Sequence, residues 1–116
     1  MKKIILAVAV VSVTLLTLSF NKVDEKKVVL QVTHQVKSYA DWKKGFDAGK
    51  KDRDNAGIKT IGVYTSVENL NLVTVIGEAP SIEVAKGFLG NPELKASMEK
   101  IGVISAPEIK ILTQMD

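Results

Sequence analysis

The chain contains a single histidine, His34, within a stretch whose side chains alternate in character from Val28 to Val36. This alternation is typical of a β-strand, and it places His34 on the same inward side as Val32. An imidazole there can act as a general base, because its pKa lies near neutral pH and its surroundings tune it. The sequence equally allows a core histidine that is hydrogen-bonded to the backbone or to a nearby polar group.

Tyr39, Trp42 and Phe46 recur at the spacing of one helix face, and Arg53 lies two turns further on. Such aromatic side chains either pack a helix onto a sheet or line a pocket for a flat ligand. Arg53 either holds an anionic group of that ligand or pairs with an acid such as Asp54. These four residues are therefore candidates for ligand binding.

Three later residues complete the candidate ligand-binding set. Tyr64 either donates a hydrogen bond to a ligand oxygen or points into solvent, and Phe88 and Met98 either wall the pocket or fill the core. No metal or cofactor is expected, because the chain has no cysteine and one histidine and lacks the glycine spacing of a phosphate-binding loop.

The charge pattern argues against nucleic acid as a partner. The formal net charge of the 116 residues is +3, and Lys2 and Lys3 supply two of those charges near the N-terminus. Further along, Lys43 is interspersed with Asp41 and Asp47. A nucleic-acid-binding face needs clustered basic residues, which this pattern lacks.

The N-terminus has the organisation of a signal peptide over residues 1–19. Lys2 and Lys3 precede the uncharged apolar run Ile4–Leu18, and small residues, Thr17 and Ser19, stand at the −3 and −1 positions of a cut after Ser19. The apolar run is also at the lower edge of the length that spans a bilayer, so an uncleaved membrane anchor is the alternative. Both predict a protein outside the cytoplasm, periplasmic or secreted.

Residues 20–27 form a charged linker, and residues 28–116 have the length of one domain. Within the domain, the patterns predict strands over 28–36, 58–67, 72–78 and 108–113. They also predict a helix over 39–56 that begins after Ser38, and shorter helices that begin after Ser81 and Asn91. This βαββαβ order predicts an α+β ferredoxin-like fold, with a four-stranded antiparallel sheet and helices on one face.

The strands are apolar on both faces, since Val73 and Val75 alternate with Leu72 and Ile76. A sheet with two apolar faces is usually buried on both. We therefore expect a homodimer in which two sheets close face to face, as a dimeric α/β barrel.

Several segments of the domain have a sequence typical of one protein superfamily: His34–Lys43 with Phe46 and Asp47, Arg53–Ile58, Val63–Tyr64, Asn71–Val73, Ala85–Leu89 and Pro92–Val103. Through these segments the domain resembles the dimeric α/β-barrel superfamily, and more closely its small antibiotic-biosynthesis-monooxygenase-like and cyclase-like members. One departure is the turn Glu68–Asn71, which commonly reads Asp-Asp-Pro-Asn in close relatives, and the leader is also unusual for that group.

The resemblance implies a homodimer with a pocket between sheet and helices in each protomer. Members of the superfamily include cofactor-independent oxygenases, haem-degrading proteins and cyclases. The sequence leaves two main functions open. One is an exported protein that binds a small apolar or aromatic molecule without catalysis. The other is a cofactor-independent monooxygenase or cyclase with His34 as general base, and with Tyr39, Trp42 and Tyr64 placing the substrate. A scaffold for protein interaction is a third reading.

Overall fold

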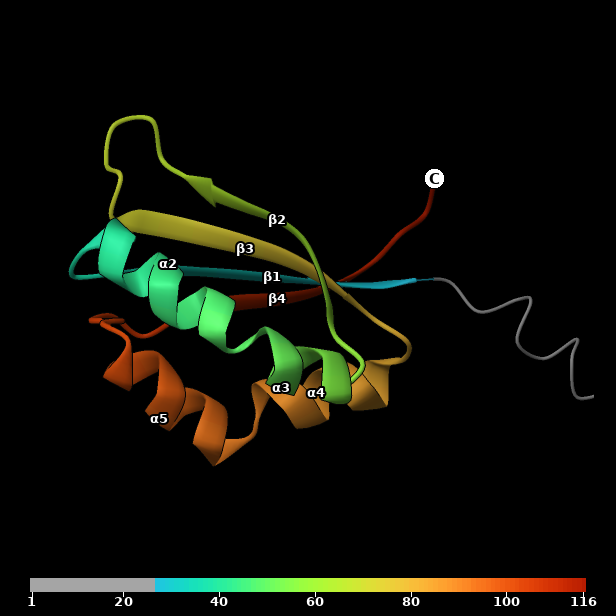
Figure 1. Cartoon of the computed structure of the whole chain (residues 1–116). Helices are drawn as coiled ribbons and strands as arrows, with labels where there is room; N and C mark the ends of the chain where they lie inside the picture. The colour runs from blue at the N-terminus through green and yellow to red at the C-terminus, as the bar shows by residue number, and fades with distance from the viewer. Residues whose placement is uncertain (1–26) are drawn as a thin grey trace, which may run out of the picture.

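A computed structural model describes residues 27–116 of the chain (Figure 1). The predicted signal peptide, and all of the predicted linker except Lys27, lie outside the described residues. Among residues 27–116, no helix is long and apolar enough to cross a membrane. The elements in chain order are β1 (Val28–Gln35), α2 (Tyr39–Ala48), α3 (Lys50–Asn55), β2 (Lys59–Thr65), β3 (Leu72–Ala79), α4 (Ile82–Leu89), α5 (Pro92–Lys100) and β4 (Glu108–Thr113).

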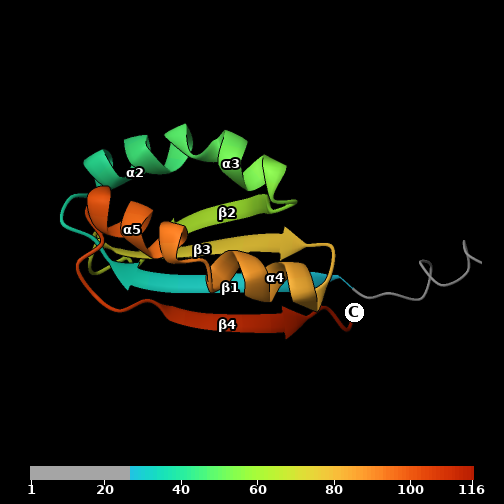
Figure 2. The same ribbon diagram turned by 90° about the horizontal axis from the view of Figure 1, so that it is seen from below.

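The four strands form one antiparallel sheet in the order β2-β3-β1-β4. All helices cover one face of this sheet, in two rows that run side by side, α2 with α3 and α5 with α4 (Figure 2). The predicted ferredoxin-like α+β fold is therefore confirmed. Between Ser38 and Asn55, however, the single predicted helix is two segments, because the chain bends at Gly49.

The helix ends follow from local sequence. Ser38, Ser81 and Asn91 each accept a backbone hydrogen bond through the side chain and so begin α2, α4 and α5. Gly57 and Gly102 have positive φ angles of 84° and 103°, which a residue with a side chain rarely adopts. Each glycine reverses the chain after a helix and leads it back toward the sheet.

Two apolar clusters lie between sheet and helices. One lies at the start of β1, around Leu30, Ile58 and Ala85. The other lies at the opposite end, around Val36, Trp42, Val73 and Val103. The space between the clusters is not filled by side chains, and it forms the candidate site.

Candidate ligand-binding cavity

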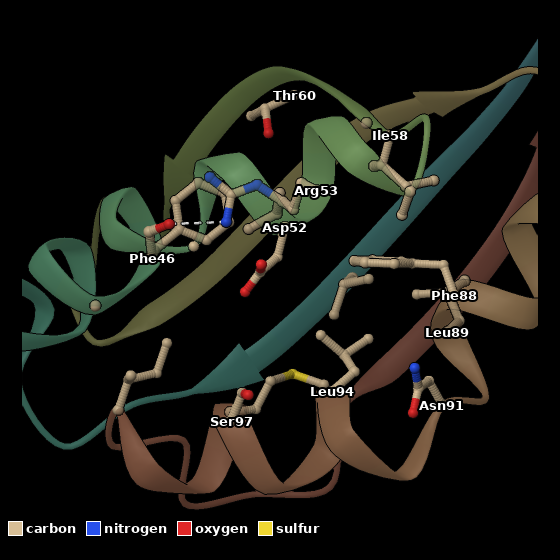
Figure 3. Close-up of a pocket in the computed structure, with 18 of the residues that line it drawn as sticks. Phe46, Asp52, Arg53, Ile58, Thr60, Phe88, Leu89, Asn91, Leu94 and Ser97 are labelled. Atoms are coloured by element: carbon tan, nitrogen blue, oxygen red, sulfur yellow. Dashed lines mark hydrogen bonds between the residues drawn. The ribbon is translucent and has the colours of Figure 1, made fainter.

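A cavity of about 510 Å³ opens between the two rows of helices, above the middle of the sheet (Figure 3). Sites for small molecules commonly measure roughly 300–1,000 Å³, so the cavity has a suitable size. Its walls are mostly apolar. The floor comes from β1 and β3 through Leu30, Val32, His34, Val75 and Gly77. The far wall comes from α4 and α5 through Phe88, Leu89, Leu94 and Met98, and from Ile101 directly after α5.

His34 is the buried polar group of this floor, with 4% of its surface exposed. Neither ring nitrogen has a hydrogen-bond partner among residues 27–116. Burial lowers the pKa of His34 below its ordinary value of 6.5, so the imidazole is neutral at pH 7. A buried polar group without a partner costs about 1–3 kcal/mol of stability, which makes this histidine an exception that calls for a cause.

The rings beside His34 form a continuous wall. Trp42, 1% exposed, meets His34 edge to face with ring centres 5.7 Å apart, and it stacks on Phe46 at 4.9 Å. The guanidinium carbon of Arg53 lies 3.7 Å from the centre of the Phe46 ring. We call these four residues, His34, Trp42, Phe46 and Arg53, the aromatic wall. All four line the cavity.

Arg53 does not form the ion pair that the sequence offered as one alternative. Its Nη1 donates to the Phe46 carbonyl oxygen at 2.7 Å, and its Nε is buried without a partner. Asp54 pairs instead with Lys50, also at 2.7 Å. Gly49 makes room for Arg53, because a Cβ there would lie 3.2 Å from Nη1.

Six of the eight residues singled out from the sequence line this cavity: His34, Trp42, Phe46, Arg53, Phe88 and Met98. Tyr39 lies behind the aromatic wall, with its ring centre 6.0 Å from that of Trp42. Its backbone nitrogen donates to Oδ1 of Asn71 at 3.0 Å, which anchors the start of α2 to the β2–β3 turn.

Tyr64 lies on the opposite face of the sheet, 55% exposed and away from the cavity. The cause is a register shift in β2 between Thr60 and Gly62, which reverses the side toward which later residues point. Val63 consequently takes the inward position. The Tyr64 ring covers Gly62, where a Cβ would meet ring atoms within 3 Å.

Asp52 is a polar lining residue that the sequence reasoning missed. Its carboxylate points into the space between α3 and α5 (Figure 3). A signal existed, because the small residues Gly45, Ala48, Gly49 and Ala56 recur with Asp52 at helical spacing and all line the cavity. Small side chains on this row leave the cavity open.

Within residues 27–116, no three His, Asp or Glu side chains are grouped closely enough to hold a metal ion. The buried chemical groups of the cavity are one neutral base, one guanidinium and apolar rings, and the carboxylates of Asp52 and Glu93 and the ammonium of Lys100 lie at its solvent-exposed border.

No protein-family model and no curated protein matches this sequence. Solved structures match over most of their length. A candidate antibiotic biosynthesis monooxygenase from Bordetella bronchiseptica is 11% identical, with a TM-score of 0.67 over 78% of this chain and 99% of that chain. SnoaB, a cofactor-independent oxygenase from Streptomyces nogalater, is 13% identical, with a TM-score of 0.64 over 79% and 96%.

A third structure is the monooxygenase ActVA-Orf6 of Streptomyces coelicolor, determined with the ligand nanaomycin D. It is 17% identical, with a TM-score of 0.58 over 78% of this chain and 89% of that chain. At such identities the likeness concerns the fold and not the site residues. The chain therefore has the ferredoxin-like fold of the antibiotic-biosynthesis-monooxygenase-like proteins.

Proposed function

We propose that this protein is a cofactor-independent oxygenase that acts on a small aromatic substrate in the cavity, with His34 as the general base. The observation that carries the proposal is the state of His34: buried, neutral and without a partner for either nitrogen. A free neutral imidazole in an apolar cavity is able to accept a proton from a bound carbon acid. The named oxygenases of the same fold support this reaction class.

The proposed reaction needs only the substrate and O₂. His34 takes a proton from a CH₂ group activated by aromatic rings and a carbonyl, which leaves a delocalised carbanion. The carbanion reduces O₂ and forms a C–O bond to give a peroxide anion. His34 returns its proton to the peroxide anion, which becomes a hydroperoxide. His34 then takes the second C–H proton as the O–O bond breaks, which forms the ketone and releases hydroxide, and the hydroxide takes this proton from His34 as water. The sum is R₂CH₂ + O₂ → R₂C=O + H₂O.

Binding without catalysis is the second candidate function. The apolar lining and the size of the cavity favour a flat apolar ligand whether or not it reacts. In that case His34 serves only as a hydrogen-bond partner of the ligand. Turnover separates the two functions.

Anthrone is a suitable test substrate, because its CH₂ lies between two aromatic rings and opposite a carbonyl. We expect the purified protein to consume O₂ and form anthraquinone faster than buffer does, with one atom of ¹⁸O₂ in the product. 9,10-Dihydroanthracene is the control, since it has the same three fused rings and far less acidic hydrogens. Tight binding of these molecules with no acceleration would leave the binding function in place and exclude the oxygenase for this substrate.

The pH dependence of turnover follows from the lowered pKa of His34. A general base must be neutral, so kcat/KM should rise as His34 loses its proton and be level above about pH 6.5. The pH at half-maximal kcat/KM should therefore lie below 6.5. A midpoint clearly above 6.5 would contradict the assignment of His34 as the base.

Stability should follow the same titration. Below pH 6.5, His34 is protonated in the unfolded chain but still neutral in the native protein, because burial lowers its native pKa. The free energy of unfolding therefore falls as the pH falls toward the lowered pKa. Above that range His34 contributes no pH dependence. Urea unfolding between pH 4.5 and 8 measures the slope, and His34→Phe should remove this part of it.

We propose that the protein forms a homodimer through the face of the sheet away from the helices. The strand registers place the apolar side chains of Val29, Leu72, Ile76 and Leu112 on that face, with Tyr64 beside them. Leu72 and Leu112 are exposed in the single chain. A second copy would remove this apolar surface from water.

Light scattering at micromolar concentration is expected to give the mass of a dimer. The double variant Leu72→Lys and Leu112→Lys should be a monomer, because it places charges in the apolar contact. Lys44→Glu, at an exposed position of α2, is the control and should stay dimeric. A monomeric unmodified protein would exclude this interface.

We also propose export of the protein, on the evidence of residues 1–19. Intact-mass measurement of the protein from the producing cells tests it. A mass that begins at Phe20 supports cleavage, whereas a membrane-bound form that retains Met1 supports the anchor. A cytoplasmic full-length protein would contradict both.

A further inference from the structure

We propose that the cavity selects aromatic ligands that carry a carboxylate, and that Arg53 is the residue that receives this group. The inference rests on the proposed function in one respect, that the cavity is the ligand site. Arg53 borders the cavity and also a second hollow of about 400 Å³ between α2, α3 and β2, which we call the rear hollow. Arg53 therefore lies at the position where the terminal group of a ligand bound in the cavity would be located.

The guanidinium of Arg53 has one edge in use and one edge free. Nη1 donates to the Phe46 carbonyl, whereas Nε is buried and has no partner. Nε–H and the nearer Nη2–H point in the same direction, and together they match the two oxygens of a carboxylate. The unused edge, formed by Nε and Nη2, is therefore one that can bind a carboxylate through two parallel hydrogen bonds.

Within the described part of the chain, no carboxylate forms an ion pair with Arg53. The nearby aspartates Asp47 and Asp54 are committed to Lys43 and Lys50, each at 2.7 Å. Burial lowers the pKa of Arg53 and the surrounding aspartates raise it, and a guanidinium stays cationic at neutral pH in either case. A partly buried cation without an anion is stabilised by a ligand that supplies one.

The charged residues around Arg53 favour an anion on the side of the rear hollow and oppose it on the side of the cavity. Lys43, Lys50 and Lys59 line the rear hollow together with Arg53, against two aspartates. Asp52 and Glu93 line the cavity and repel an anion, whereas Lys100 attracts one, and all three are exposed to solvent, which screens their charges. We therefore expect a preference of about tenfold rather than the larger effect of an isolated buried pair.

The aromatic wall sets where the rest of the ligand lies. From His34 to Trp42, to Phe46 and to Arg53, successive centres are 5.7, 4.9 and 3.7 Å apart. A fused-ring molecule laid along this wall reaches Arg53 with one end while another part stays near His34. The carboxylate then orients the ligand and leaves the carbon acid to the base.

Two ligands of equal shape test the inference: anthraquinone-2-carboxylate and the neutral 2-(hydroxymethyl)anthraquinone. Binding is followed by quenching of Trp42, the single tryptophan, and by calorimetry. The unmodified protein should bind the carboxylate about tenfold more tightly, and 0.5 M NaCl should shrink the difference. Arg53→Met should abolish the preference, and Asp52→Asn should increase it.

Lys44→Met is the matched control, because it removes a cation from α2 that lines neither hollow. It should keep the preference within about twofold. Equal binding of the two ligands by the unmodified protein would overturn the role of Arg53 and leave the cavity as the ligand site. Binding of neither would count against the proposed function itself. Equal binding of the two ligands by the unmodified protein would overturn the proposal even where Arg53→Met fails to fold.

Discussion

Replacing His34 by alanine is expected to lower kcat for oxygenation by about 10²–10⁴-fold, the usual cost of losing a general base. The reason is that His34 is the neutral base of the cavity floor, and neither of its nitrogens is engaged in a hydrogen bond within residues 27–116. O₂ consumption and product formation, measured with the same substrate and corrected for the spontaneous reaction, give the ratio. KM should change much less, because the apolar walls remain.

The same variant offers a test that a merely structural histidine would fail. The alanine leaves space for free imidazole next to the cavity, so millimolar imidazole should restore part of the lost kcat. The rescue should increase with the neutral fraction of imidazole as the pH rises. A His34→Ala protein that keeps turnover within a few-fold of the original would dismiss His34 as the base.

His34→Phe separates catalysis from stability. Phenylalanine retains the ring against Trp42 and removes two buried nitrogens that have no partner in the native protein. We therefore expect no activity, together with a free energy of unfolding that is unchanged or about 1 kcal/mol higher. A loss above about 2 kcal/mol would show that the histidine stabilises the core. A substitution that abolishes activity and raises the free energy of unfolding is typical of functional residues.

Much of this fold could be predicted from the sequence because its signals are local. Ser81 and Asn91 cap helices through their own side chains, and Gly57 and Gly102 end helices where a positive φ is required. The alternation in β1 placed His34 on the inward face. These features depend on a few neighbouring residues and on the hydrophobic period, which a sequence displays directly.

The remaining features depend on contacts between distant segments. The register shift near Ile61 reverses Tyr64, and nothing in the alternation of β2 marks it. Whether the space beside the aromatic wall is filled or open depends on how α5 packs across from α2. At that contact Gly45 faces Ile101, where a Cβ would lie 2.7 Å from the Ile101 Cβ. The free edge of Arg53 likewise follows from its stacking on Phe46.

Trp42→Ala is expected to lower the free energy of unfolding by about 3–5 kcal/mol, among the largest losses for a single core residue. Trp42 is 1% exposed and packs against the rings of His34, Tyr39 and Phe46. A domain of this size is stabilised by only about 5–15 kcal/mol in total, so the variant should be close to unfolding at 37 °C. Urea unfolding must be followed by circular dichroism, because the variant contains no tryptophan.

Two further variants, Trp42→Phe and Val67→Ala, test whether the lower free energy of unfolding of Trp42→Ala comes from lost packing of the indole. Phenylalanine keeps the stack on Phe46 and shortens the reach toward His34, so it should cost less than alanine while still moving the pH midpoint of turnover. Val67, 96% exposed in the β2–β3 turn, should change stability by no more than about 0.5 kcal/mol. A Trp42→Ala loss near that of Val67→Ala would mean that the indole is dispensable for packing. The aromatic wall would then lack the rigidity needed to hold a substrate against His34, and the oxygenase mechanism would lose its positioning element.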